Sequence, residues 1–379
     1  MKILTKVKTL EKELIKSIKA INYKSPIPIL SHILLRAEKN NELNLYSTDL
    51  EIGIENKTQA QVLEEGSACI PAKVFAEIMG YLNSENEIVI ESNDNMLEIR
   101  DYNKNYKLNI LPEEDFPKLP KPSDIPLLTV KKRIFKQLIS DTVFSAASID
   151  ETQAVLTGVL FLIKGQVLSM ISTDGRRLSK IEHRVNDVFP AEEKYIVPSK
   201  SLIELHKIID ETEGEVEIFT NQYQIFFKFD NVIFYSRLIE GQYPNFEKVI
   251  LKDNEVKISF SIKREKILKS IKGISIMACE RESPNLIKFD INENKIIINS
   301  KTQDLGEAQE EIEIKPLIKG KLNIAFNSRY LIDALNNMEE KEVEFRLKGE
   351  KNPGLIKPVG RDEYLYAVMP IELMEKIHH

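Results

Sequence analysis

The chain has 379 residues, of which 42% are hydrophobic and 30% charged, and its formal net charge is −6. This length exceeds one ordinary domain and indicates two or three folded domains. The sequence has neither a long uncharged apolar run nor a signal-peptide pattern, which argues against a membrane or secreted protein and predicts a cytoplasmic one. The acidic balance argues against a protein that is basic over its whole surface, but it allows DNA binding through one basic face.

The cysteines and histidines are not grouped as a metal site or a catalytic centre requires. Cys69 and Cys279 each stand alone in an apolar stretch, which predicts two buried thiols. The five histidines are scattered or end the chain. We therefore expect no metal ion and no cofactor.

The first predicted helix surrounds residues 15–18, Ile-Lys-Ser-Ile, where apolar residues recur at three- and four-residue spacing. A similar pattern, again with lysine in second place, occurs at residues 135–138 and 268–271. The recurrence indicates that the chain contains three related units.

A second predicted helix confirms this period within the sequence. Residues 70–78 recur at 197–205, an offset of 127, and again in the pattern of 326–335. Each copy predicts a strand end, a Pro-Ala, Pro-Ser or Asn-Ser turn, and an amphipathic helix. A basic residue holds the fourth place in each copy, namely Lys73, Lys200 and Arg329.

Strand patterns with alternating side chains follow these helices, at residues 87–91, 215–219 and 342–346. Two shorter motifs are also repeated between the first two units at matching offsets. Residues 47–49 resemble residues 172–174, and residues 115–117 resemble residues 242–244. We therefore expect an α+β fold of three similar domains, with limits at 1–124, 125–252 and 253–379.

The predicted helices carry lysines on one face. Lys12, Lys16 and Lys19 lie opposite a stripe of leucine and isoleucine. The matching sets in the other two units are Lys132, Arg133 and Lys136, and Lys266, Lys269 and Lys272. One such face is usually plain solvated surface, but its recurrence in three units favours contact with DNA phosphates, without sequence readout.

Three motifs resemble signatures of a known family. They are residues 172–179 (Ser-Thr-Asp-Gly-Arg-Arg-Leu-Ser), 236–246 and 366–371 (Tyr-Ala-Val-Met-Pro-Ile). In this order, and together with the threefold repeat, they make essentially the whole chain similar to the bacterial β sliding clamps, the β subunits of DNA polymerase III.

This resemblance implies domains of the DNA-clamp type, each with two helices packed on antiparallel sheets, and a head-to-tail homodimer closed into a ring. It implies a processivity factor, not an enzyme. The implied partners are double-stranded DNA, a second copy of the chain, the replicative DNA polymerase, the clamp loader and other clamp-binding proteins. No membrane and no cofactor are implied.

The resemblance also implies roles for individual residues. Tyr106 and Leu108 would meet Ile276 and Met277 of the second copy, although all four also suit an ordinary core. A cleft for an apolar peptide would be lined by Leu156, Thr173, Gly175, Arg176, Arg177, Leu178, Pro244, Lys248, Val249, Asn327, Tyr330, Val368, Met369, Pro370, Ile371 and Leu373. DNA would be contacted by Lys24 and, from the repeats, by Lys12, Lys16, Lys73, Lys136, Lys200, Lys269 and Arg329.

Three departures from the family pattern leave the peptide preference open. Arg176 stands where the family often has histidine, Glu372 where a basic residue is frequent, and residues 280–283 are polar where some members have an aromatic side chain.

Two other functions stay as alternatives: a repeat scaffold that binds proteins only, and a metal-dependent enzyme acting on nucleic acid. The enzyme is disfavoured because residues 173–177 lack the glycine-rich loop of a nucleotide site. Their echo at 47–49 indicates instead a duplicated turn in which aspartate accepts hydrogen bonds from backbone amides.

Overall fold

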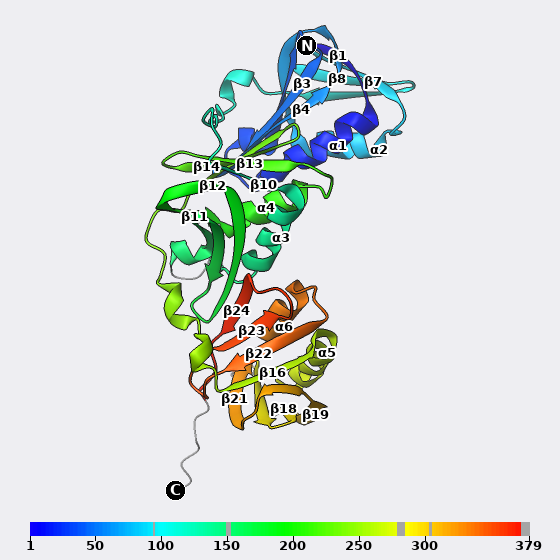
Figure 1. Cartoon of the computed structure of the whole chain (residues 1–379). Coiled ribbons are helices and arrows are strands. Elements are labelled where there is room, and N and C mark those ends of the chain that lie inside the picture. Colours follow the sequence, from blue (N-terminus) through cyan, green and yellow to red (C-terminus); the bar gives the residue numbers. More distant parts are fainter. Residues whose placement is uncertain (94, 149–152, 279–284, 303–304, 373–379) are drawn as a thin grey trace. The chain divides into compact units, whose positions relative to one another are not determined.

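The computed structural model describes residues 1–93, 95–148, 153–278, 285–302 and 305–372. The chain splits into two compact units, called unit 1 and unit 2, which do not coincide with the three sequence repeats. Unit 1 is Met1–Lys136 with Lys200–Leu238, and unit 2 is Gln137–Ser199 with Ile239–His379. In Figure 1 the blue and cyan segments belong to unit 1, and the yellow to red segments belong to unit 2.

Unit 1 is built from two antiparallel sheets and the helices packed on them. The strand orders are β5-β1-β7-β8-β9 and β10-β13-β14-β15-β4-β3-β2-β6. Its elements are β1 (Lys2–Lys6), α1 (Val7–Ser17), β2 (His32–Glu38), β3 (Glu42–Thr48), β4 (Ile52–Gln59), β5 (Gln61–Glu64), β6 (Gly66–Pro71), α2 (Ala72–Tyr81), β7 (Glu87–Asn93), β8 (Met96–Asp101), β9 (Lys104–Asn109), β10 (Leu128–Lys131), the start of α3 (Lys132–Val143), most of α4 (Ser199–Ile208), β13 (Glu215–Thr220), β14 (Gln224–Phe229) and β15 (Val232–Arg237).

The core of unit 1 follows from the periodicity of its sequence. Val7, Leu10 and Leu14 are buried at three- and four-residue spacing, so one face of α1 packs against the sheets. Side chains alternate along β2 and β3, so Leu35 and Leu45 join the helix side while the residues next to them face the opposite side. The eight-stranded sheet therefore has helices on one face and a different cluster on the other.

The first predicted helix has a smaller basic face than its sequence indicates. Lys12 is exposed, but Lys16 and Lys19 are half-buried, and Lys16 Nζ lies 3.1 Å from a carboxylate oxygen of Glu13. Lys19 lies in the 3-10 turn that follows the end of α1 at Ser17, which changes the direction of its side chain, whereas Lys16 lies within α1 and pairs with Glu13. The expectation of one exposed face is therefore not met for Lys16 and Lys19.

Lys132 departs further from expectation, because its side chain is fully buried. Its Nζ lies 2.9 Å from oxygens of both Asp210 and Asp230 and donates to Thr212 Oγ1 at 2.7 Å. Burial lowers the pKa of Lys132, but the two carboxylates outweigh it and raise the pKa above its ordinary value. Lys132 is thus a structural ion-pair residue and does not belong to the exposed basic face.

This ion-pair group makes the stability of unit 1 depend on pH. Burial opposes ionisation of Asp210, but its bonds to Thr212 and Lys132 lower its pKa to about 2. Since this pKa is depressed in the folded state, its stabilisation is present above pH about 4 and is lost as the pH falls toward 2. Asp210→Asn should cost about 1 kcal/mol at pH 7, a small value because the carboxylate is partly exposed, and almost nothing at pH 2. Urea unfolding at both pH values checks this.

A turn at one end of β3 is repeated in unit 2 with the same hydrogen bonds. Asp49 Oδ1 accepts from the amides of Glu51 and Ile52, and Thr48 Oγ1 donates to the carbonyl of Ile52. At the matching place Asp174 Oδ1 accepts from two amides, and Thr173 Oγ1 donates to a carbonyl. The predicted role of aspartate in a duplicated turn is therefore confirmed.

The two turns differ at the residue that needs a left-handed backbone. Gly175 has φ 86°, and the matching Leu50 has φ 77°. Leucine is strained in this conformation, so we expect Leu50→Gly to raise the free energy of unfolding by roughly 0.5–1 kcal/mol. Leu63→Gly is the matched control, because Leu63 is similarly exposed but lies in a strand, where glycine should destabilise. Thermal unfolding of both variants tests the assignment.

Unit 2 also has two antiparallel sheets. Their strand orders are β11-β12-β24-β23-β22-β16-β20 and β19-β18-β17-β21. Its main elements are β11 (Gly158–Thr173), β12 (Arg177–Pro198), β16 (Ile258–Lys263), α5 (Arg264–Ser275), β17 (Leu286–Asn292), β18 (Lys295–Thr302), β19 (Gly306–Glu313), β20 (Lys315–Ile318), β21 (Leu322–Asn327), α6 (Ser328–Asn337), β22 (Glu342–Leu347), β23 (Gly354–Pro358) and β24 (Tyr364–Val368).

Short 3-10 turns complete the fold, at Ile18–Ala20, Pro28–Ser31, Glu113–Asp115, Ala154–Thr157, Phe246–Val249, Asp253–Glu255 and Ile276–Ala278. Mixed helices and antiparallel sheets confirm the predicted α+β class. In the part of the chain that is described, no helix combines the length and the apolar character that crossing a bilayer requires.

Candidate functional site

The predicted cleft centres on the turn between β11 and β12, two paired strands that are labelled in Figure 1. Gly175 and Arg176 are exposed at the tip of this turn, and Thr173 and Leu178 are buried at its base. The Asp174 side chain holds the turn by accepting from the amides of Arg176 and Arg177 at 2.9 and 3.0 Å. The turn is therefore fixed by its own sequence before any partner binds.

Arg177 forms a rigid wall of this site. Its side chain is only 12% exposed, and its nitrogens lie 2.9 Å from Asp174 Oδ2 and 2.6 Å from Asp333 Oδ2. Its guanidinium also lies over the Tyr330 ring, 4.6 Å from the ring centroid. Burial lowers the pKa of Arg177, but the surrounding negative groups outweigh it and keep the pKa above the ordinary value. Because these contacts already engage its guanidinium, Arg177 is better suited to form a fixed wall of the site than to donate hydrogen bonds to the carbonyls of a bound peptide.

A small pocket lies beside this wall. Its volume is about 20 Å³, which is room for about one water molecule. Its lining residues are Thr173, Gly175, Arg176, Arg177, Leu178, Val249, Pro353, Ala367, Val368 and Met369. A peptide side chain can enter only if a wall moves, and the partly exposed, flexible Met369 is suited to move.

Eight of the predicted cleft residues line this pocket, and seven other described ones do not. Asn327 caps α6 by accepting from the Arg329 amide at 2.9 Å, so its side-chain oxygen is already engaged. The Ile371 amide donates to the Ala325 carbonyl at 2.8 Å. The remaining predicted residues outside the pocket lining are Leu156, Pro244, Lys248, Tyr330 and Pro370, and Leu373 lies outside the described residues.

Sequence reasoning missed two pocket residues. Ala367 lies inside the motif at 366–371 and could have been found from its place opposite Leu178 on the neighbouring strand. Pro353 comes from a separate turn before β23, and the sequence carries no signal that brings it here.

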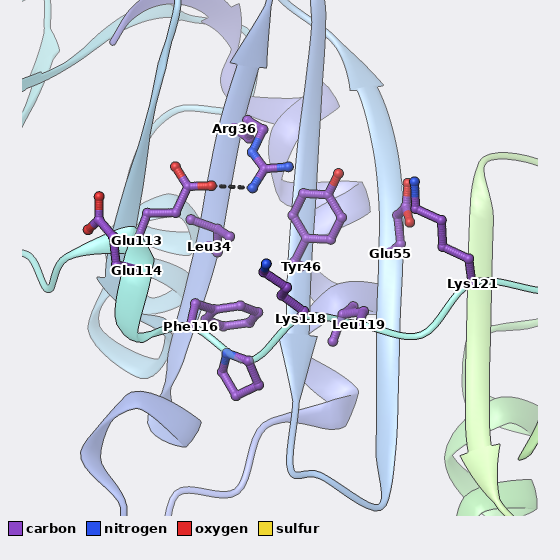
Figure 2. A pocket seen from close by; sticks show the side chains of 11 residues that line it. Leu34, Arg36, Tyr46, Glu55, Glu113, Glu114, Phe116, Lys118, Leu119 and Lys121 are labelled. Atoms are coloured by element: carbon purple, nitrogen blue, oxygen red, sulfur yellow. Dashed lines mark hydrogen bonds and ion pairs between the residues drawn. The ribbon is translucent and has the colours of Figure 1, made fainter. Parts of the chain in front are cut away.

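A much larger cavity, of about 580 Å³, lies in unit 1 beneath the segment that follows β9. Figure 2 shows it over β2, β3 and β4, with Leu34, Tyr46 and Phe116 among the residues around it. Arg36 forms an ion pair with Glu113 and lies over the Tyr46 ring, 5.3 Å from its centroid. Burial, together with the charge of Glu55, raises the pKa of Tyr46 to about 12.

The larger cavity is a poorer fit for an apolar peptide than the small pocket. Its rim carries three basic residues and three acidic ones, so no net charge selects a ligand. None of the predicted site residues lines it. The pocket in unit 2 is therefore the better candidate for the cleft, although it is much smaller than the cavity in unit 1.

The predicted DNA-binding residues fall into two groups. Lys12, Lys24, Lys73, Lys269 and Arg329 are exposed, and within the described residues no ion pair engages their side chains. The other three predicted residues have carboxylate neighbours, with Lys16 near Glu13, Lys136 3.5 Å from Glu211 and Lys200 3.8 Å from Asp49. The first group is better placed to meet phosphates.

The predicted subunit-contact residues lie on an edge strand of unit 1 and in a 3-10 turn of unit 2. Tyr106 and Leu108 are half-buried on β9, the edge strand of the five-stranded sheet, and pack against the core of unit 1. Ile276 is 70% exposed in the turn after α5, and Met277 is half-buried beside it. The exposed Ile276 is not explained by core packing within the chain.

The two cysteines and the possible metal ligands bear on whether the chain has a reactive or metal-binding site. Cys69 is buried, as predicted, and burial raises the pKa of its thiol to about 12. Cys279 lies outside the described residues, as do residues 280–283. Among the described residues, no group of three histidine, cysteine or acidic side chains is placed to hold a metal ion.

Comparison with known proteins decides the family. Residues 1–120, 129–245 and 248–372 match the N-terminal, central and C-terminal domains of the DNA polymerase III beta subunit. The chain belongs to this family. A "Beta sliding clamp" of Staphylococcus aureus is 31% identical over 364 residues, which are 94% of this chain and 95% of that relative.

Solved structures agree with this family. A sliding clamp from Bacillus subtilis has a TM-score of 0.93 at 27% identity, covering 98% of this chain and 99% of that one. A clamp from Pseudomonas aeruginosa bound to griselimycin has a TM-score of 0.92 at 25% identity, covering 98% and 100%. The resemblance stated from the motifs and the clamp-type fold are confirmed. As a member of the DNA polymerase III beta subunit family, the chain is a sliding clamp, an accessory replication factor and not an enzyme.

Proposed function

We propose that two copies of this chain close head to tail into a ring around double-stranded DNA and tether the replicative polymerase, the clamp loader and other partners through the cleft in unit 2. The match of three successive clamp domains over residues 1–372 carries this proposal. We propose that these domains have their limits at 1–124, 125–252 and 253–379, and that the protein works in the cytoplasm.

Two edge strands of opposite charge support the head-to-tail contact. In unit 1 the edge strand β9 carries Lys104 and Lys107. In unit 2 the edge strand β19 carries four glutamates, namely Glu307, Glu310, Glu311 and Glu313. An edge strand has unpaired backbone groups that can bond another strand, and opposite charges favour one partner over self-pairing. We propose that β9 of one copy meets β19 of the other, with Tyr106, Leu108, Ile276 and Met277 forming the apolar part.

Exposed lysines support the contact with DNA. Lys12, Lys24, Lys73, Lys269 and Arg329 would attract phosphates through charge alone, which allows sliding because no base is read. Lys16, Lys136 and Lys200 would contribute after leaving their carboxylate neighbours. The closed ring would supply retention, so each contact can be weak.

The chemistry of the pocket supports binding of an apolar peptide. Leu178, Val249 and Val368 form aliphatic walls, and Met369 offers an adaptable one. The Pseudomonas aeruginosa clamp is bound to griselimycin in its solved structure. We propose that griselimycin also binds this chain, in the same pocket as partner peptides.

Retention on circular DNA tests the proposed function. The protein would be loaded on a nicked circular plasmid with a bacterial clamp loader and separated from free protein by gel filtration. A ring should stay on the circle at raised salt and should leave when a restriction enzyme linearises the plasmid. Release by salt alone, with no effect of linearisation, would show electrostatic binding without encirclement and would reject the ring.

A further inference from the structure

The two units contain the same strand junction at matching places. In unit 1, β15 pairs with β4, and in unit 2, β24 pairs with β12. The Thr-Asp turn with identical hydrogen bonds lies at the end of both junctions, so positions can be matched one by one. The cleft pocket of unit 2 therefore has a definite counterpart in unit 1, which we call the counterpart site.

One cross-strand pair differs sharply between the two junctions. In unit 2, Leu178 lies opposite Ala367, and both line the cleft pocket. At the matching place in unit 1, Gly53 lies opposite Tyr235. In unit 2 the larger residue of the pair is on β12, whereas in unit 1 it is on β15, the strand that matches β24, and it is aromatic.

The Tyr235 ring fills the counterpart site. A Cβ atom on Gly53 would lie 2.2 Å from Tyr235 Cε1, so the ring occupies the space that the Leu178 side chain takes in unit 2. The ring is 6% exposed, lies 6.1 Å from the Phe226 ring centroid, and its hydroxyl is 3.0 Å from Thr48 Oγ1. Burial raises the pKa of this hydroxyl, so it stays a neutral hydrogen-bonding group.

We infer that Tyr235 limits each chain to one peptide site, because its ring closes the place in unit 1 where the repeat would otherwise form a second cleft. This inference rests on the proposed function of the cleft in unit 2. Tyr235 would thereby set the number of partners that each chain, and so each ring, can bind at one time.

The rim of the counterpart site indicates how a reopened site would differ. Glu51 and Arg237 hold the places of Arg176 and Met369, and they lie 3.8 Å apart as an ion pair. A charged pair replaces the flexible methionine wall, so an apolar ligand should bind there more weakly than in unit 2.

Exchanging the cross-strand pairs tests the inference in the full-length protein. The double variant Gly53→Leu/Tyr235→Ala gives unit 1 the pair found in unit 2, and Leu178→Gly/Ala367→Tyr does the reverse. Griselimycin is the probe, and isothermal titration calorimetry counts the sites per chain. We expect one site in the parent protein, two in the first variant and none in the second. The second site of the first variant should be about 10- to 100-fold weaker than the first.

Controls separate this inference from the proposed function. Tyr235→Phe keeps the ring and should keep one site, and Phe226→Ala disturbs the same cluster without emptying the counterpart site and should also keep one. Circular dichroism would verify that each variant is folded. One site in folded Gly53→Leu/Tyr235→Ala, with one in the parent, overturns the inference alone. No binding to the parent would instead reject the proposed cleft, and the inference with it.

Discussion

Arg361→Ala is expected to lower the free energy of unfolding of the protein by about 3–5 kcal/mol, because it leaves a buried carboxylate without its partner. Arg361 forms an ion pair with Asp141, whose side chain is fully buried. Arg361 comes from the turn before β24 and Asp141 from α3, so this pair fastens two segments of unit 2 that are far apart in sequence. Urea unfolding followed by circular dichroism measures the loss.

The pH dependence of this loss identifies its cause. Burial raises the pKa of Asp141 even with Arg361 present, and removing Arg361 takes away a group that lowers it. In the variant the carboxyl can avoid its unpaired charge by taking up a proton, and a raised folded-state pKa favours stability at low pH. The loss should therefore be smaller at pH 5 than at pH 8. An equal loss at both values would contradict the buried-charge explanation.

Two further variants serve as comparison. Arg346→Ala breaks ion pairs with Asp253, which is 91% exposed, and with Glu344, so it should cost less than about 1 kcal/mol. The double variant Asp141→Leu/Arg361→Met replaces both charges by apolar groups and should recover most of the stability lost in Arg361→Ala. A double variant as unstable as Arg361→Ala would mean that Arg361 acts through packing alone.

Much of the fold was predictable because the chain repeats itself. Two helix patterns and one strand pattern occur in three copies, so each could be inferred three times, and the shared turn at Thr48 and Thr173 aligns the first two copies. The motifs at 172–179 and 366–371 led to seven residues of the small pocket. Local periodicity and duplicated motifs were sufficient for these features.

What could not be predicted depends on contacts between distant segments. Lys132 reads as one more lysine of a basic helix, since only the folded chain brings Asp210 and Asp230 to it. The direction of the Lys19 side chain depends on where α1 ends, a boundary that side-chain spacing does not fix. Pro353 reaches the pocket through the pairing of β23 with β24, which is likewise a tertiary event.

Reversing the charges of either edge strand should dissociate the dimer, and mixing the two variants should restore it. In Lys104→Glu/Lys107→Glu, an acidic β9 would face an acidic β19 at both contacts of the ring, and like charges at an interface cost several kcal/mol. Glu307→Lys/Glu310→Lys/Glu311→Lys/Glu313→Lys makes β19 basic and creates the opposite repulsion. In a head-to-tail mixed pair, the acidic β9 meets the basic β19, and the native β9 meets the native β19, so both contacts are complementary.

Sedimentation velocity distinguishes these states. Each variant alone should sediment as a species of the 43.6 kDa chain, and an equimolar mixture should give a species of about twice that mass. Lys39→Glu, at an exposed turn away from either edge strand, should remain dimeric and controls for net charge. Rescue by mixing is specific to a head-to-tail arrangement of β9 against β19. If both variants stayed dimeric alone, or if mixing restored nothing, the ring would have to close through other surfaces.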